Sequence, residues 1–326
     1  MLFAKSLATF AVLLVEGLSF PAIHSSHRSF LKTTTTGYST CSPLFASESD
    51  DALNDLLMTR FPTSVDDQIR QASAALQRAS SDGIHRHSVR LLLPVIGATE
   101  LDDWPGGARQ MMEAARPLMQ RVLENLGALT ISTSMLDSSD GVYALFSQAK
   151  AAKDDACTVL LPSSDSVTVL QGLEAQVGPK RNLILVNAQW KRRTDFGFFG
   201  GGDQVAQVET FVPTFSCTNL MVEGDQVRVL RSYPGPWRVF LRQNADANKE
   251  GSNVVWTEIG QKEVQEDKPL DFDQDPANKR DGGKLFDYGQ PSYRECETMI
   301  MAMDGYRPKS VTERAAAAIT FIKDTL

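Results

Sequence analysis

Short apolar runs alternate with longer segments of helical periodicity through much of this 326-residue chain. Runs of this length, bounded by turn residues, are typical of strands that are buried inside a sheet. We expect strands at residues 88–94, 128–132, 157–161 and 183–186. A segment before the first of these strands predicts a helix from residue 65 to the Asp82-Gly83 pair. The segments between the strands predict helices from residue 105 to Gly127, at 141–150 and at 166–177. Because strands that alternate with helices favour a parallel sheet covered on both faces, the sequence predicts a three-layer α/β fold.

The pattern changes after Thr218, where strand candidates follow one another closely. They lie at residues 219–222, 226–232, 237–242 and 253–259, with hairpin turns at 223–225 and 233–236. We therefore expect an antiparallel extension of the parallel core, which makes the sheet mixed. Two helices at residues 292–301 and 311–323 end the chain, after an acidic loop near 260–288. The length and the lack of an internal repeat predict a single domain over residues 48–326.

Local signals define the ends of two of these helices. Ser64, with Asp67 three residues later, predicts a capped start for the first helix. Gly127 is expected to end the second helix, and Pro117 inside it is expected to kink or split it because proline has no amide proton.

The first 47 residues have the composition of two targeting signals in series. One base, Lys5, precedes an apolar run at residues 7–15, which predicts a signal peptide over residues 1–19. Residues 20–47 contain no acidic residue and are rich in Ser and Thr, which predicts a disordered transit peptide. The Phe20-Pro21 junction resembles the cleavage motif of bipartite presequences in algae with a secondary plastid. The alternative is a secretory signal followed by a disordered propeptide.

Charge and cysteine usage exclude several classes of protein. The net charge of −7 argues against general nucleic-acid binding, which needs Lys and Arg to neutralise phosphates. No apolar run approaches the roughly 20 residues of a membrane span. Beyond the leader, Cys157, Cys217 and Cys296 are widely spaced and odd in number. Such a set favours a reducing compartment over a disulfide framework.

Polar residues follow several of the expected strands. Ligands in an open α/β sheet bind beyond the carboxyl ends of the parallel strands, so these residues form a candidate ligand site. The set consists of Asp102, Asp103, Gln110, Ser163, Ser164, Asp165, Asn187, Gln189 and Trp190. The alternative is structural: Asp103, Ser163 or Asp165 caps a helix, and Asn187 holds a loop.

Other polar motifs give weaker signals. Lys191, Arg192 and Arg193, followed by glycines at 200–202, suggest an anion site, but Asp203 opposes a negative ligand there. A lid or a solvated basic patch is the alternative.

We predict no metal site and no cofactor. Asp271, Asp273 and Asp275 imitate a calcium loop in which Pro276 replaces the required glycine and Gly282 the bidentate Glu. His85 and His87 are expected to be solvated.

The segment from Tyr233 to Trp237 predicts a rigid hairpin turn, because its two prolines preset the backbone. Trp237 is expected to pack into the core. Alternatively, Tyr233 and Trp237 form an aromatic docking surface for a protein partner.

Several of these motifs occur together in a characteristic order: Phe61-Pro62-Thr63-Ser64, Gly83, residues 103–107 with Gln110, residues 187–190, Phe196-Gly197 and residues 233–237. This order resembles DUF1995, a domain-of-unknown-function family of plastid and cyanobacterial proteins, over roughly residues 61–301. The family is similar to the low-photosystem-II-accumulation 3 proteins and to a region attached to some plastid adenylate kinases. The resemblance implies plastid residence and a role in photosystem II assembly. No set of catalytic residues comes with it.

The sequence thus leaves three hypotheses for function. The first is a non-enzymatic factor, in the stroma or on the thylakoid, that assists assembly of photosystem II or another thylakoid complex by binding proteins. The second is a binder of, or enzyme on, a phosphorylated or nucleotide small molecule at the strand ends. The third is a purely structural module. The oligomeric state is left open.

Overall fold

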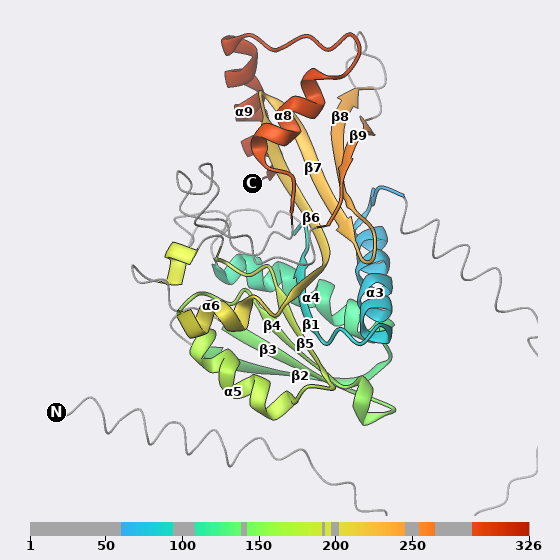
Figure 1. Ribbon diagram of the computed structural model, residues 1–326, viewed down its shortest axis with the longest axis vertical. Helices are drawn as coiled ribbons and strands as arrows, with labels where there is room; N and C mark the ends of the chain where they lie inside the picture. Colours follow the sequence, from blue (N-terminus) through green and yellow to red (C-terminus); the bar gives the residue numbers. More distant parts are fainter. Residues whose placement is uncertain are drawn as a thin grey trace, which may run out of the picture. The chain divides into compact units, whose positions relative to one another are not determined.

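The computed structural model describes residues 60–93, 108–137, 142–190, 193–196, 202–244, 254–264 and 289–325. These residues belong to one compact unit, Ser47–Leu326. They form a nine-stranded sheet with the strand order β2-β3-β4-β5-β1-β6-β7-β8-β9 (Figure 1). The expected signal and transit peptides and residues 265–288 of the acidic loop expected near 260–288 lie outside the described residues, whereas residues 260–262 belong to the last strand of the sheet.

The sheet has a parallel centre and antiparallel sides. Strands β4, β5, β1 and β6 pair in parallel, and every other neighbouring pair is antiparallel. The predicted α/β class with a mixed sheet is therefore confirmed. The strand bounds are β1 (Arg86–Arg90), β2 (Ala128–Asp137), β3 (Val142–Ala149), β4 (Ala156–Leu160), β5 (Asn182–Val186), β6 (Val212–Val222), β7 (Asp225–Ser232), β8 (Trp237–Asn244) and β9 (Val254–Lys262).

Helices cover both faces of the sheet, so the fold has three layers (Figure 1). Helices α3 (Val65–Ser81) and α4 (Ala108–Asn125) bury their apolar residues in a core cluster that runs across one face. On the opposite face, α5 (Val167–Val177) and α6 (Gly202–Val208) cover a second cluster, and α8 (Tyr293–Met301) covers a third. Short 3-10 turns occupy Ala152–Asp154 and Arg193–Phe196, and α9 (Val311–Thr325) ends the chain. No helix among the described residues is long and apolar enough to cross a bilayer.

The helix that we expected at residues 141–150 is wrong, because this segment is strand β3. β3 lies between β2 and β4, where a strand is covered on both faces and loses the alternation that identifies it. Val142, Ala144 and Leu145 are all fully buried. A short run that is apolar on both faces fits a buried helix and a buried strand equally well.

Strand β6 begins at Val212, earlier than the expected start at residue 219. Its first residues pair in parallel with β1, with His87 opposite Val212 and Arg90 opposite Ser216. From Phe215 onward β6 pairs antiparallel with β7. One strand therefore belongs to both the parallel core and the antiparallel extension.

The expected helix signals are present where they can be tested. Ser64 is the N-cap of α3, and its hydroxyl accepts a hydrogen bond of 3.0 Å from the Asp67 amide. Helix α4 is continuous from Ala108–Asn125 and is not split at Pro117. Pro117 lies on the exposed side of α4, where a carbonyl that loses its amide partner can bond to water.

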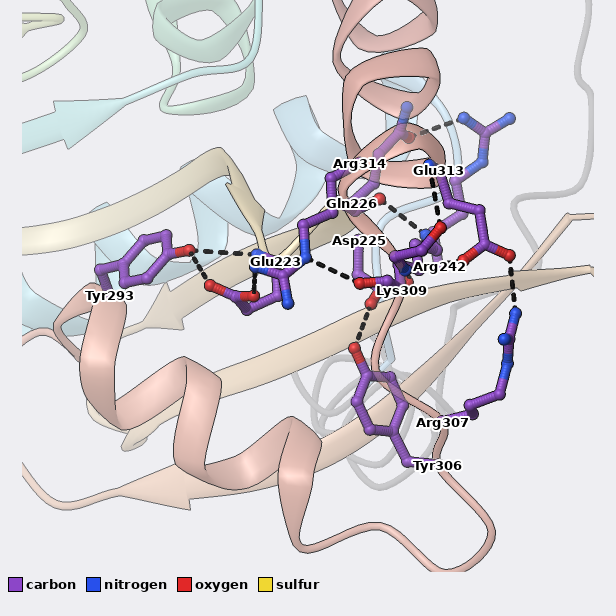
Figure 2. A network of polar contacts seen from close by, with 12 residues as sticks. Glu223, Asp225, Gln226, Arg242, Tyr293, Tyr306, Arg307, Lys309, Glu313 and Arg314 are labelled. Carbon is purple, nitrogen blue, oxygen red and sulfur yellow. Dashed lines mark hydrogen bonds and ion pairs between the residues drawn. The ribbon is translucent and has the colours of Figure 1, made fainter.

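A polar network fastens the last two helices to the turn between β6 and β7 (Figure 2). The Lys309 ammonium donates to the Gly224 carbonyl at 2.6 Å and to the Asp225 carboxylate at 2.7 Å. Tyr306 donates to the other Asp225 oxygen at 2.7 Å. Glu223 forms an ion pair with Arg314 of α9 and accepts a hydrogen bond from Tyr293 of α8. The hairpin turn is thus the attachment point of the carboxyl-terminal segment.

Replacing Gly224 by Ala tests this attachment. Gly224 has φ +84°, and an added Cβ would lie 3.0 Å from the Arg314 Cα, whereas Gly127 has φ +92° and open space around it. The left-handed conformation alone costs a residue with a Cβ about 1–2 kcal/mol. We expect Gly127→Ala to lower the free energy of unfolding by that amount and Gly224→Ala by clearly more, measured by urea denaturation. Equal losses in the two variants would contradict the close packing of α9 on the turn.

Candidate functional site

The structure brings part of the expected polar set together at the carboxyl ends of two parallel strands. Ser163, Ser164 and Asp165 follow β4, and residues 187–190 follow the neighbouring parallel strand β5. The Gln189 side chain donates to the Leu161 carbonyl at 2.9 Å, which joins the two loops. Gln110 is apart from these loops: it is buried in α4, which belongs to the helix layer formed with α3. Asp102, Asp103, Lys191 and Arg192 lie outside the described residues.

Asn187 acts as a side-chain extension of the sheet. Its Oδ1 accepts from the Leu91 amide at 2.7 Å, and its Nδ2 donates to the Leu91 carbonyl at 3.0 Å. The backbone of Asn187 has φ +50°, a left-handed conformation that asparagine tolerates better than most residues. The side chain thereby continues the pairing of β1 with β5 after the strands have ended.

The N-cap position of α5 is not one of the two residues that the sequence suggested, Ser163 and Asp165. The N-cap of α5 is Ser166, which makes no side-chain cap bond to the helix. Its hydroxyl donates instead to the Ser163 carbonyl at 2.7 Å, which tightens the loop. Asp165 is exposed to solvent.

The aromatic residues of the Tyr233–Trp237 turn do not share an exposed surface. The Trp237 side chain is only 1% exposed and belongs to the third core cluster. Tyr233 is half-buried, and its hydroxyl donates to an Asp82 carboxylate oxygen at 2.9 Å. Arg193 lies in the 3-10 turn Arg193–Phe196, before α6.

A cavity of about 40 Å³ lies on the sheet face that carries α6 and α8, between the second and third core clusters. The lining residues come from strands β1, β5, β6 and β8, from α6 and the segment after it, and from the segments after β5 and before α8. The lining includes Ser88, Arg90, Ser216, Trp237, Trp190 and Gln290. Among the described residues of the expected ligand site, Trp190 alone lines this cavity, and Trp237 of the expected partner surface lines it as well.

Arg90 is the charged group of the cavity. Its Nη2 donates to the Trp190 carbonyl at 3.5 Å, and burial lowers the pKa of its guanidinium. Within the described ranges, no carboxylate is paired with Arg90. A cation that is removed from water without a counter-ion is costly, so this side chain is a candidate ligand contact.

Ser216 lies directly opposite Arg90 in the pairing of β1 with β6. It is 1% exposed, and its hydroxyl has no hydrogen-bond partner in the part of the chain that the structure describes. Arg90 and Ser216 were missed in the sequence because strand register, which makes them neighbours, is not visible there. The available signal was an arginine inside the otherwise apolar run 89–93.

His87 lies on the other face of β1 and is buried, so the expectation that it is solvated is wrong. Its Nδ1 lies 2.9 Å from the Thr214 hydroxyl, and its Nε2 lies 3.3 Å from Asn182 Oδ1. Burial lowers the pKa of His87 to about 4. The buried thiols of Cys157 and Cys217 have pKa values raised to about 12 by burial, so neither is a reactive nucleophile at neutral pH.

Replacing Asn187 by Gly tests its structural role. Glycine adopts the left-handed backbone conformation easily, but the variant loses both hydrogen bonds to Leu91. Its free energy of unfolding should therefore be about 1–3 kcal/mol lower than that of the unmodified protein. Asn187→Ala should lose about 1 kcal/mol more, because alanine also strains the backbone. Chemical denaturation measures both losses. A glycine variant as stable as the unmodified protein would show that these bonds contribute nothing.

The buried histidine predicts a pH dependence of stability. Because the folded pKa of about 4 lies below the ordinary 6.5, the unfolded chain binds a proton at pH 5 that the folded chain does not. The contribution of neutral His87 to the free energy of unfolding is thus complete above pH 6.5 and is lost as the pH falls toward 4. The loss between pH 7 and pH 5 is about 2 kcal/mol. The free energy of unfolding, measured by chemical denaturation, should differ less between pH 7 and pH 5 for His87→Gln than for the unmodified protein. Equal differences in the two proteins would show that a group other than His87 takes up the proton.

Comparison with known proteins gives one match. The family model described as a domain of unknown function, DUF1995, matches residues 62–263, which include every described strand and all the cavity residues named above except Gln290. No curated protein and no solved structure matches the chain.

Proposed function

Since this chain belongs to the DUF1995 family, a domain of unknown function, we propose that it is a plastid protein that assists assembly of photosystem II or another thylakoid complex. It does so by binding a protein partner rather than by catalysis. The composition of residues 1–47 and the resemblance to the low-photosystem-II-accumulation 3 proteins support this proposal.

The proposed location is the stroma or the thylakoid surface of a secondary plastid, reached through a bipartite presequence. The apolar run at residues 7–15, the Phe20-Pro21 junction and the lack of acidic residues from 20 to 47 support it. A fluorescent fusion of the full chain tests it: signal confined to the chlorophyll-containing compartment is expected, and signal outside it would count against plastid residence.

The feature that carries the proposal of protein binding is the edge strand β2. It has one neighbour, β3, and its other side pairs with no described residue. Its sequence from Ala128 to Leu136 contains no charged residue and no proline, and Leu129 and Met135 are 72% and 54% exposed. The irregular pairing lies at its two ends and leaves the middle regular.

Such an edge is open to strand addition. Proteins usually protect edge strands with charges, proline or bulges, because an unpaired backbone bonds readily to another extended chain. In strand addition, backbone hydrogen bonds supply the affinity, and alternate side chains supply the specificity. An extended, uncharged segment of an assembly partner fits β2.

Affinity capture from plastid extract, with the full chain as bait, tests the function. Recovery of identified photosystem or thylakoid subunits is the expected result. Recovery of none of them would count heavily against a role in assembly.

The double variant Leu129→Lys, Met135→Lys tests the surface. Both side chains are exposed, so the stability should change by no more than about 0.5 kcal/mol for each substitution. Recovery of the captured subunits should fall at least about tenfold, because charges on an edge strand oppose strand addition. Val311→Lys is the matched control, since Val311 is 82% exposed but lies on α9. Equal recovery with the double variant and the control would exclude β2 as the binding surface.

A second candidate function is binding of, or catalysis on, a phosphorylated or nucleotide small molecule at the strand ends. The cavity beside Arg90 is the observation that favours it. A thermal-shift screen with nucleotides and sugar phosphates tests it, and a flat response from folded protein would count against it.

A further inference from the structure

We propose that the cavity beside Arg90 binds an oxyanion group, a phosphate or a carboxylate, carried by a small molecule. The proposal rests on the second candidate function, which it deepens by naming the recognised group and the residues that hold it. It does not depend on the binding of a protein at β2.

The first argument is the charge of Arg90. Its guanidinium carries five N–H donors, and its one hydrogen bond to a described residue, the Trp190 carbonyl at 3.5 Å, is long and occupies a single donor. Burial already disfavours the charged form, and no carboxylate among the described residues compensates it. The planar guanidinium matches the oxygens of a carboxylate or phosphate in geometry and in sign.

The second argument is the hydroxyl of Ser216, which is independent of the charge. A buried hydroxyl without a partner destabilises the fold, so one that is retained beside a cavity indicates a group that bonds to it there. Ser216 faces Arg90 across adjacent strands and lines the same cavity. Both groups donate hydrogen bonds, so their common ligand accepts them.

The next strand continues this row of side chains. In the pairing of β6 with β7, Ser216 lies opposite Arg231, whose side chain is fully buried. The Arg231 guanidinium carbon lies 5.7 Å from the centre of the Trp237 ring, which lines the cavity. Ser216 thus stands between two arginines in the sheet, a setting that favours a negative ligand over a neutral one.

The size of the cavity limits what enters it. A volume of about 40 Å³ exceeds the 10–15 Å³ that one water needs but is far below the 300–1,000 Å³ of pockets that enclose a whole drug-sized ligand. The cavity therefore receives only the charged group, against Trp190 and Trp237, while the rest of the molecule lies outside it. A whole nucleotide does not fit inside.

The full chain can be tested with simple anions. Thermal unfolding and tryptophan fluorescence are followed while sodium phosphate or sodium acetate is added up to about 50 mM, against sodium chloride at matched ionic strength. A rise of a few degrees in Tm and saturable quenching with phosphate alone identifies a phosphate site. The same response with acetate alone identifies a carboxylate site, and a response to both identifies a general oxyanion site. No response to either anion beyond that of chloride overturns the proposal.

Variants locate the site. Arg90→Met and Ser216→Ala should each weaken anion binding at least about tenfold, as the loss of a charge-assisted hydrogen bond does. Arg121→Met, on α4 of the opposite face, is the matched control and should bind like the unmodified protein. Wild-type affinity in both cavity variants would overturn the assignment even if the anion binds elsewhere.

Stability without anion separates a binding role from a structural one. Arg90→Met should raise Tm in chloride, because it replaces a half-buried cation, which no described carboxylate compensates, by an apolar side chain of similar length. A lower Tm would mean that Arg90 supports the fold and would count against the proposal. If Arg90→Met does not fold, titrations of Arg90→Lys and Ser216→Ala decide, with weakened binding expected in both. The Leu129→Lys, Met135→Lys double variant should bind anions like the unmodified protein. The anion titration therefore tests the cavity even if the proposed protein binding at β2 is wrong.

Discussion

The pairing of β6 with both β1 and β7 is the interaction on which the rest of the structure depends. A parallel core and an antiparallel hairpin sheet could exist as separate layers, each with its own core. Here β6 pairs with β1 through its first residues and with β7 from Phe215 onward, so both belong to one sheet. The first core cluster consequently runs from α4 to β8 without interruption. The cavity lies on the opposite face beside β1 and β6, between the second and third core clusters.

The contrast between Asn187 and Ser216 separates structural from functional polar groups at this edge. Both lie beside the carboxyl end of β1. The Asn187 side chain bonds to the amide and the carbonyl of Leu91, whereas the Ser216 hydroxyl has no hydrogen-bond partner among the described residues. A satisfied amide needs no ligand to explain it. An unsatisfied hydroxyl beside an uncompensated arginine costs free energy on both counts, and a single oxyanion would offset both. For this reason the polar residues most visible in the sequence carry less functional information than the two that were overlooked.

The sequence predicted the features that depend on local chemistry. The Ser64 cap, the glycine at the end of α4 and the two hairpin turns follow from residues within a few positions of one another, and all are present. The failures are non-local. The segment 141–150 is a strand because β2 and β4 lie on either side of it, and the buried state of His87 depends on Thr214, more than 100 residues away. Cross-strand neighbours such as Arg90 and Ser216 are fixed by register, which a single sequence does not reveal.

The two proposed binding surfaces lie too far apart to share one small-molecule ligand. Four strand spacings separate β2 from β1, which is roughly 19 Å at the usual distance between neighbouring strands. Between them, β3, β4 and β5 are buried strands that pair in regular register and leave little freedom for one site to deform the other. Coupling between sites requires an element with two alternative arrangements, and the packed centre of this sheet offers none among its described residues. Substitutions at β2 and at the cavity should therefore act additively, so the two proposals stand or fall separately.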